Sequence, residues 1–485
     1  MAESDILDLL VIGGGVNGAG VARDAAGRGL KVALLEAGDL GGATSSASSK
    51  LVHGGLRYLE FYEFALVRKA LAEREVILRN APHISRPMPF LLPLEPHLRP
   101  AALIRLGLFL YDHLARRREV PGSTSVDLRQ DAAGPAFQRQ RTRAFRYWDG
   151  WIDDSRLVIL NARDAADRGA GIFPRDAAVS ARRTDFGWEV GAASGRRHAA
   201  RQVLNCAGPW AGQVASGLLQ LPDAPRLSLV QGGHIVTRKV NRTADAWMLQ
   251  QPDGRIIFVI PWEGEFSLIG TTETPVEDPA AHSLTAAEEQ YLLEAVNRSL
   301  AKPLEPADIV HRFAGVRPLV LEDGKSARET TRDWRLLRHE GAAAMTVVGG
   351  KITTYRLLAE AVLKQLFPET TRWTAKAPLP GGDIPRLGGT AAADLAQWLT
   401  HLKARHNLYD PAIVTRMAHL WGTETDSMLD QGLGENFGGL FEAELQHMQE
   451  REWAMTADDA LWRRTKAGLH MDATAQAKVK AFFGA

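Results

Sequence analysis

Residues 8–36 open with Asp8-Leu-Leu-Val-Ile, continue through Gly13-Gly14-Gly15-Val16-Asn17-Gly18 and close, after a run of helical character, with Lys31-Val-Ala-Leu-Leu-Glu36. This order predicts a strand, a glycine turn, a helix and a second strand that ends in an acid. Gly13, Gly15 and Gly18 hold the G-x-G-x-x-G positions. These positions provide a tight turn, close approach of the backbone to a diphosphate, and close packing of helix on strand.

Glu36 stands where a carboxylate accepts hydrogen bonds from both ribose hydroxyls of an adenosine. The free N–H groups at the start of the predicted helix face the diphosphate. Framed by two strands and an acid, the fingerprint indicates a bound dinucleotide, although by itself it does not tell NAD from FAD. The cofactor contacts expected from this unit are Gly13, Gly14, Gly15, Asn17, Gly18 and Glu36.

The 485 residues are enough for two or three domains. A formal net charge of +1 gives no global indication of nucleic-acid binding. The single cysteine, Cys206, rules out an intramolecular disulfide and favours a reducing, intracellular compartment. The predicted first strand begins near residue 8 and no apolar run approaches about 20 residues, so we expect neither a signal peptide nor a membrane-spanning helix.

Two strands that end in glycine turns, at residues 8–15 and 345–350, bracket most of the chain, and we expect both in one sheet. Residues 1–377 are expected to hold two interleaved domains: a cofactor domain mainly from 1–78, 150–215 and 340–377, and a substrate domain mainly from 79–149 and 216–339. A Pro/Gly cluster at 378–389 predicts a linker. Residues 390–485 lack clear strand patterns, which predicts a helical C-terminal domain.

The densest group of polar side chains reads Ala43-Thr-Ser-Ser-Ala-Ser-Ser-Lys-Leu-Val-His-Gly-Gly-Leu-Arg-Tyr58. Its hydroxyls and lysine follow closely on Glu36, so they can donate to oxygens of the same dinucleotide. A second small-residue turn, Asn205-Cys-Ala-Gly208, can lie against the adenosine or the diphosphate, and its cysteine is expected to be a packed residue. The further cofactor contacts expected are Thr44, Ser45, Ser46, Ser49, Lys50, Leu51, His53, Gly54, Gly55, Ala207, Gly208, Gly350 and Lys351.

Arg57, Arg317 and Lys351 each lie within three residues of a glycine in the sequence. Arginine binds a phosphate through two parallel hydrogen bonds, whereas lysine adds a compact point charge. Three such cations converging on one anionic group would form a site for a phosphorylated substrate.

The 14 histidines form no H-x-x-x-H pair beside a third ligand, and no G-x-S-x-G elbow is present. Neither a metal site nor a serine hydrolase is therefore expected.

The apolar, arginine-flanked segment 98–118 leaves two interpretations open. It is either a core helix with arginines at its C-terminal end or a helix that lies on an anionic membrane surface.

Several motifs together resemble FAD-dependent (aerobic, respiratory) glycerol-3-phosphate dehydrogenase: the fingerprint, the 43–58 stretch, Gly315-Val-Arg317-Pro-Leu and Gly349-Gly-Lys351-Ile-Thr-Thr-Tyr-Arg. Further matches follow in the family's order, so the resemblance spans nearly the whole chain. They are Ile257-Phe-Val-Ile-Pro-Trp262, Ile269-Gly-Thr-Thr272, Thr331-Arg-Asp333 and Asp458-Asp-Ala-Leu-Trp-Arg-Arg-Thr-Lys466. One departure is Glu273, where we expect Asp in close relatives.

The resemblance implies an α/β fold with a Rossmann-type FAD-binding domain of the glutathione-reductase/D-amino-acid-oxidase type, a mixed-sheet substrate domain and an α-helical C-terminal domain. It implies oxidation of sn-glycerol 3-phosphate to dihydroxyacetone phosphate, with electrons passed through FAD to a membrane quinone. The protein would then lie in the cytoplasm, held peripherally at the inner membrane, and could form a homodimer. This favours the membrane interpretation of segment 98–118. The substrate residues carried over are Arg57, Tyr58, Arg317, Lys351, Thr354 and His234.

The base that removes the substrate hydroxyl proton stays open between His53 and His234, with arginine-assisted loss to water as a third route. Arg317 is expected to orient the substrate during the reaction. Three other functions compete: an oxidase that uses dioxygen, an amine or hydroxy-acid oxidase on the same scaffold, and a non-redox protein that binds a dinucleotide.

Overall fold

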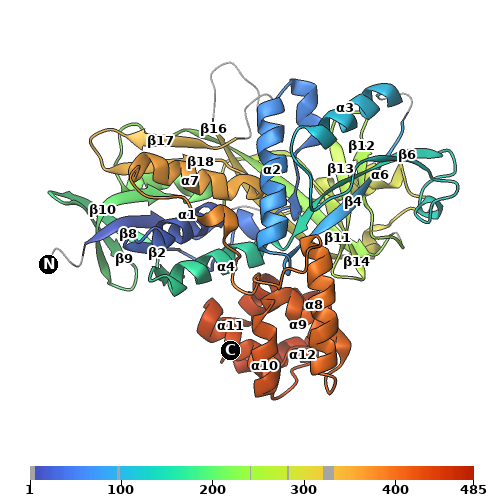
Figure 1. The fold of residues 1–485 in the computed structure, drawn as a ribbon. Helices are drawn as coiled ribbons and strands as arrows, with labels where there is room; N and C mark the ends of the chain where they lie inside the picture. Colours follow the sequence, from blue (N-terminus) through green and yellow to red (C-terminus); the bar gives the residue numbers. More distant parts are fainter. Residues whose placement is uncertain (1–5, 96–98, 241, 281–282, 321–332, 485) are drawn as a thin grey trace.

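The computed structural model describes residues 6–95, 99–240, 242–280, 283–320 and 333–484. Leu98, Thr331 and Arg332, which belong to segments quoted above, lie outside these ranges. Figure 1 shows two sheets side by side, with the C-terminal helices packed below them.

The first sheet contains the fingerprint strand. Among the described residues it has eight strands, with the order β17-β18-β10-β1-β2-β7 and with β8 and β9 attached through β10. Parallel pairing of β1 with β2 and β10 places the glycine turn after β1 in the middle of the sheet. Its strands are β1 Leu7–Ile12, β2 Val32–Leu35, β7 Gly171–Phe173, β8 Ala178–Thr184, β9 Gly187–Ala192, β10 Arg197–Asn205, β17 Arg335–His339 and β18 Ala344–Val348.

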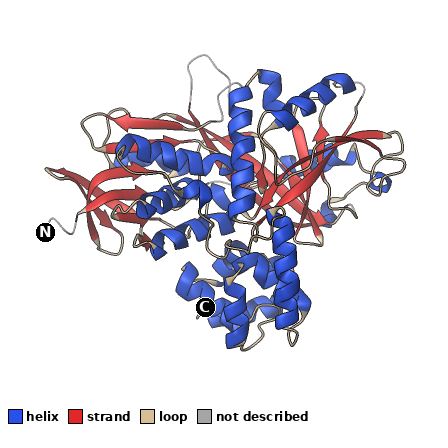
Figure 2. Cartoon of the chain, in the orientation of Figure 1, coloured by secondary structure: helices blue, strands red, loops and turns tan. Residues whose placement is uncertain are grey.

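Strand β1 is buried on both faces because its residues are apolar at successive positions. Leu9 and Val11 pack with helices α1, α4 and α7, whereas Leu10 and Ile12 pack on the opposite side with Trp188 and the segment after β10. This alternation follows from the two-residue period of a strand, and a continuous apolar run is typical of a parallel strand covered on both faces. Figure 2 shows the helices that cover the first sheet.

The second sheet forms the other half of the interleaved region. Among the described residues it has ten strands, with the order β15-β11-β14-β13-β12-β4-β6-β3 and with β16 and β5 attached to β11 and β6. One face packs on α2 and α3, and the other packs on α6. Its strands are β3 Leu51–Val52, β4 Ser85–Pro93, β5 Thr124–Asp127, β6 Arg143–Ile152, β11 Leu227–Arg238, β12 Ala246–Gln250, β13 Ile256–Trp262, β14 Phe266–Gly270, β15 Thr274–Val276 and β16 Ile309–Val320.

Two strands cross the expected domain boundaries. β17 belongs to the first sheet although its residues precede 340, because it forms an antiparallel hairpin with β18. β3 belongs to the second sheet although it lies within 1–78, because it pairs with the end of β6.

The helices complete the layers around the two sheets. Their bounds are α1 Val16–Gly27, α2 Phe64–Asn80, α3 Ala101–His113, α4 Asp154–Asp167, α5 Ala211–Gln213, α6 Ala286–Asn297, α7 Tyr355–Leu366, α8 Ala391–Arg405, α9 Pro411–Trp421, α10 Glu424–Gln431, α11 Glu442–Glu452 and α12 Ala473–Phe482. Among the described residues, no helix has both the length and the apolar character needed to cross a bilayer.

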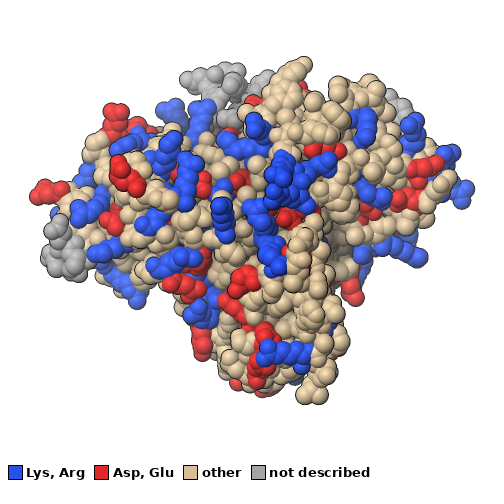
Figure 3. Space-filling view, viewed as in Figure 1, with Lys and Arg blue, Asp and Glu red and all other residues tan. Residues whose placement is uncertain are grey.

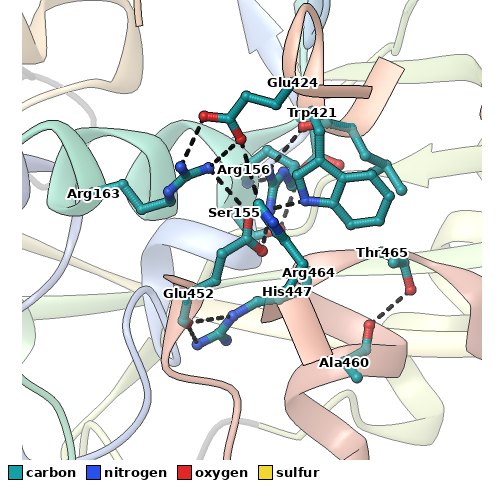
Figure 4. Close-up of polar contacts among 12 residues, drawn as sticks. Ser155, Arg156, Arg163, Trp421, Glu424, His447, Glu452, Ala460, Arg464 and Thr465 are labelled. Carbon is teal, nitrogen blue, oxygen red and sulfur yellow. Dashed lines mark hydrogen bonds and ion pairs between the residues drawn. The ribbon is translucent and has the colours of Figure 1, made fainter. Parts of the chain in front are cut away.

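The C-terminal helices α8 to α12 enclose a core of their own, and a web of buried ion pairs joins them to α4. Arg156 of α4 donates to Glu452 at 2.6 Å, and neither side chain is exposed to solvent. Arg163, about two turns further along the same face of α4, donates twice to Glu424 at 2.8 Å. Figure 4 shows both arginines pointing from α4 toward the C-terminal helices. Trp421 adds a hydrogen bond from its indole N–H to Glu452 at 3.1 Å.

Replacing Glu452 by Gln should lower the free energy of unfolding by about 3–5 kcal/mol, because it leaves Arg156 buried without its counter-charge. Burial raises the pKa of the Glu452 carboxyl, but Arg156 and His447 outweigh burial and hold that pKa well below its ordinary 4.5. Ionised Glu452 therefore stabilises the fold above about pH 4.5, and the contribution is lost as the pH falls further.

Urea unfolding followed by tryptophan fluorescence, repeated across this pH range, measures the loss. Glu450→Gln on the exposed side of the same helix is the matched control and should leave the midpoint unchanged. Equal midpoints for the two variants at pH 7 would show that the buried pair does not stabilise the domain contact.

Candidate active site

One large cavity of about 1260 Å³ runs between the two sheets. Its lining includes Glu36 and Asp39, which follow β2, and a group formed by Tyr58, Arg317 and Lys351, here called the cation end. The volume exceeds the roughly 300–1,000 Å³ of common small-molecule pockets, as an elongated dinucleotide together with a substrate would require.

The glycine turn forms the middle of the cavity wall. Gly13 has φ +109°, and a Cβ built there would lie 2.5 Å from the Cys206 carbonyl oxygen. A Cβ on Gly18 would lie 1.9 Å from the Gly13 oxygen, so helix α1 approaches β1 as closely as it does only because this residue is glycine. The start of α1 therefore presents its backbone N–H groups to the cavity, where they suit a diphosphate.

Backbone N–H groups of the protein itself hold the Glu36 carboxylate in place. Its two carboxylate oxygens accept from Gly14 N at 2.6 Å and from Gly38 N at 2.7 Å. Burial raises the pKa of Glu36, and these two N–H groups oppose that rise. The carboxylate lies at the end of β2 beside the cavity, where it can accept from the hydroxyls of an adenosine ribose.

Fifteen of the residues predicted from sequence line the cavity. They are Gly13, Gly15, Asn17, Glu36, Thr44, Ser45, Ser49, Leu51, His53, Tyr58, Ala207, Gly208, Arg317, Gly350 and Lys351. They come from the turns after β1, β2, β10 and β18, from the start of α1, from β3 and the residues that flank it up to Tyr58, and from β16, so the cavity brings together residues that are far apart in sequence. Cys206 also lines it, and burial raises the pKa of this thiol, which fits a packed residue.

Lys50 lies outside the cavity lining. Its ammonium is buried and pairs with Asp154 at 2.8 Å, and it also donates to the Ser46 carbonyl at 3.1 Å. These contacts direct the ammonium into the protein, where it supports the 43–58 stretch. The other predicted residues outside the cavity lining are Gly14, Gly18, Ser46, Gly54, Gly55, Arg57, His234 and Thr354.

Two of the residues outside the lining, Arg57 and Thr354, were predicted to bind the substrate. Arg57 lies in the short helix Leu56–Phe61, with its Nε buried. Of the three cations predicted to converge, Arg317 and Lys351 line the cavity and Arg57 does not. Thr354 is buried, and its neighbour Thr353 lines the cavity in its place.

The two candidate bases have different surroundings. His53 lines the cavity, and its backbone N–H donates to Thr353 Oγ1 at 3.3 Å. His234 is 1% exposed, stacks on Phe313 with ring centroids 4.9 Å apart, and is hydrogen-bonded through Nε2 to Ser49 Oγ at 2.8 Å. Burial, together with the charges of Arg317 and Lys50, lowers the pKa of His234 well below its ordinary value.

The cation end is organised around aromatic and hydroxyl groups. Lys351 Nζ lies 4.0 Å from the centre of the Tyr58 ring, and Arg317 donates to Thr271 Oγ1 at 3.4 Å. Both side chains border the same cavity as Glu36. Among the described residues, no group of His, Cys, Asp and Glu side chains could hold a metal ion. Arg317 and Lys351 can bind an anion, and His53 in the same lining can accept a proton.

Sequence reasoning missed several lining residues, among them Arg175, Phe258, Thr271, Arg335 and Arg463. Arg175 follows β7 in a left-handed conformation, and Arg463 comes from the C-terminal region. The available signal was that Phe258, Thr271 and Arg463 lie within the matched motifs 257–262, 269–272 and 458–466.

A model of the family described as DAO, FAD dependent oxidoreductase, matches residues 8–356. The chain belongs to this family. Its cofactor is FAD, and the glycine turn, Glu36 and the volume of the cavity fit that molecule.

Full-length relatives narrow the family further. The chain is 47% identical to D-erythritol 1-phosphate dehydrogenase of Brucella abortus (strain 2308), over 97% of this chain and 96% of that one. It is 45% identical to aerobic glycerol-3-phosphate dehydrogenase of Escherichia coli (strain K12), again over 97% and 96%. A solved structure of glycerol-3-phosphate dehydrogenase from Bacillus halodurans with FAD superposes with a TM-score of 0.76 at 28% identity, covering 96% of this chain and 87% of that one. The resemblance predicted from sequence is thereby confirmed.

Proposed function

We propose that this enzyme oxidises sn-glycerol 3-phosphate to dihydroxyacetone phosphate and passes the electrons through FAD to a membrane quinone. The observation that carries the proposal is that Arg317 and Lys351 line the same cavity as Glu36 and the glycine turn. Two cations there suit a phosphate monoester, and His53 in the same wall suits removal of a hydroxyl proton.

Each of these residues has a distinct task. Arg317 and Lys351 bind the phosphate, and this fixes the position of the substrate's C2 carbon in the cavity. His53 accepts the C2 hydroxyl proton while FAD supplies the hydride acceptor. His234 acts through Ser49, because it lies outside the cavity and its low pKa opposes proton uptake.

The electron acceptor is tested by steady-state turnover with sn-glycerol 3-phosphate under two conditions. Turnover should be fast with a soluble quinone analogue under argon and slow in air alone. Peroxide formed in air at the quinone-supported rate would contradict the quinone proposal and favour the oxidase. A substrate panel that adds amino and hydroxy acids tests the remaining oxidase alternative, for which a two-cation site is not required.

A second substrate, D-erythritol 1-phosphate, is favoured by one observation: the relative named for it shares 47% of its residues with this chain over nearly the full length. D-erythritol 1-phosphate, like sn-glycerol 3-phosphate, has a phosphate and a secondary alcohol. Arg317 and Lys351 would bind its phosphate, and His53 would accept its hydroxyl proton. The ratio of kcat/KM for the two substrates decides between them, and a value above one for D-erythritol 1-phosphate would transfer the proposal to that substrate.

The membrane contact that quinone reduction requires is proposed at helix α3 and the neighbouring residues 56–62, which precede α2. Helix α3 is apolar on two faces: Ile104, Leu108 and Tyr111 are buried, whereas Leu103, Leu106 and Phe109 are each more than half exposed. The adjoining Phe61 and Tyr62 are 59% and 80% exposed, and α3 packs against their segment. Figure 3 shows that the surface over these elements is largely uncharged. The core interpretation of segment 98–118 fits the buried face of this helix, and the proposed membrane contact uses its exposed face.

The buried face of α3 also reaches the active site. Tyr111 donates to Asp149 and accepts from the backbone N–H of Gly54 at 2.8 Å, next to His53. The same helix thus joins the proposed membrane surface to the turn that carries the base.

Leu106→Glu/Phe109→Glu should weaken binding to vesicles of anionic phospholipid by at least about tenfold, because each glutamate replaces an apolar side chain that would enter the lipid. Turnover with a soluble acceptor should not change. Val179→Glu is the matched control, since Val179 is 60% exposed on β8 of the first sheet. Sedimentation with vesicles measures the effect, and equal losses for the double variant and the control would rule out this surface.

A further inference from the structure

The segment Asp458–Lys466, here the clasp segment, joins the C-terminal domain to the cofactor domain. It contains the π-helical turn Asp459–Arg464. Lys466 donates to Asp153 at 2.7 Å and to Ser155 at 2.6 Å, at the start of α4. Trp462 stacks on His311 of the second sheet with ring centroids 4.5 Å apart. The clasp segment therefore touches both halves of the interleaved region.

Arg463 of the clasp segment also lines the FAD cavity. It is, among the described residues, the one residue of 390–485 in the cavity wall, and it lies there with Glu36, Asp39 and Arg175. Because Glu36 marks the adenosine end of the cavity, Arg463 belongs to that end. Its side chain is 20% exposed, so part of this side chain faces open space.

Asp39 fixes Arg463 in this position. It lies three residues after Glu36 and is 5% exposed. Its carboxylate pairs with Arg463 and with Arg464, the latter through a second contact at 2.8 Å. Arg464 has no exposed side-chain surface and also donates to the Glu452 carbonyl at 2.6 Å, so it anchors the clasp segment to α11.

Arg175 approaches the same corner from the other side. It donates to Asp459 at 2.8 Å, which also binds Arg463. Its Nη1 is buried, has no hydrogen-bond partner among the described residues and lies 3.7 Å from Asp39. Two planar guanidinium groups thus border the adenosine end, where arginine can stack on an aromatic base or donate to its nitrogens.

We propose that Arg463, with Arg175, binds the adenosine half of FAD, so that tight retention of FAD requires the clasp segment to be docked. The C-terminal domain is then part of the cofactor site. This inference concerns cofactor binding and does not depend on which polyol phosphate is oxidised.

The test measures the Kd of the apoprotein for FAD by quenching of flavin fluorescence. Arg463→Ala should raise this Kd by about tenfold, the effect of losing one charge-assisted contact. The affinity for FMN, which has the flavin and one phosphate but no adenosine, should be unchanged. ADP should compete with FAD more weakly in the variant than in the wild-type protein.

Arg451→Ala is the matched control. Arg451 pairs with Asp167 at 2.9 Å across the same two domains but lies outside the cavity wall. It should leave the Kd for FAD unchanged. If Arg463→Ala does not fold by circular dichroism, Arg175→Ala replaces it with the same expectations. Equal Kd values for the tested variant and Arg451→Ala, or an equal loss of FMN and FAD affinity, would overturn the proposal.

Discussion

Replacing His53 by Asn lowers kcat for sn-glycerol 3-phosphate by about 100- to 10,000-fold, the range expected when a general base is removed. Asn keeps hydrogen-bonding capacity without accepting a proton, so binding should change little. The turn that carries His53 is held firmly: Gly54 N donates to Tyr111 Oη, and Asp149 binds both Tyr111 and Arg74. Loss of activity will therefore reflect lost chemistry and not a displaced loop.

Stopped-flow reduction of the flavin under argon measures the His53 effect on the first half-reaction. His234→Asn is the comparison, because His234 lies outside the cavity and is linked to it only through Ser49. We expect a smaller loss and an unchanged pH profile for His234→Asn, since burial and two nearby cations keep its pKa well below the working range. A larger loss in His234→Asn than in His53→Asn would reverse the two assignments.

Replacing Arg317 by Ala lowers kcat/KM by about 100- to 1,000-fold, because the bidentate phosphate contact both binds the substrate and fixes C2 for reaction. The loss should appear in KM and in kcat, since phosphate binding also sets the position of the reacting carbon. With glycerol, which lacks the phosphate, wild type and variant should be equally slow.

Steady-state kinetics with both substrates measures the Arg317 effect, and Arg312→Ala is its control. Arg312 lies on the same strand, β16, but pairs with Glu289 at the surface and lies outside the cavity wall. The assignment of Arg317 to the phosphate fails if Arg317→Ala keeps its kcat/KM or if Arg312→Ala loses as much.

The parts of the structure that local patterns determine were predictable. The glycine spacing at 13–18 and the acid at 36 specify a turn, a helix start and a carboxylate whose positions depend on residues close in sequence. The common sheet of β1 and β18 was also predictable, because two glycine-ended strands suggested it.

What sequence did not reveal depends on contacts between distant segments. Lys50 is of a residue type that often binds phosphate, but its ammonium binds Asp154, which is 104 residues away in the sequence. Arg175 lies in no matched motif, and it meets Arg463 only because the C-terminal domain docks beside Asp39. Helix α3 is apolar on two faces, so periodicity could not assign it to core or surface.

The central claim is that the cation end of the cavity presents a phosphorylated alcohol to FAD for oxidation. Anaerobic titration of the holoenzyme with sn-glycerol 3-phosphate, followed by the visible absorbance of the flavin, tests it most directly. We predict that the yellow colour bleaches with sn-glycerol 3-phosphate and persists with glycerol at the same concentration. A flavin that stays oxidised with every phosphorylated polyol would contradict the account and identify a protein that binds FAD without this chemistry.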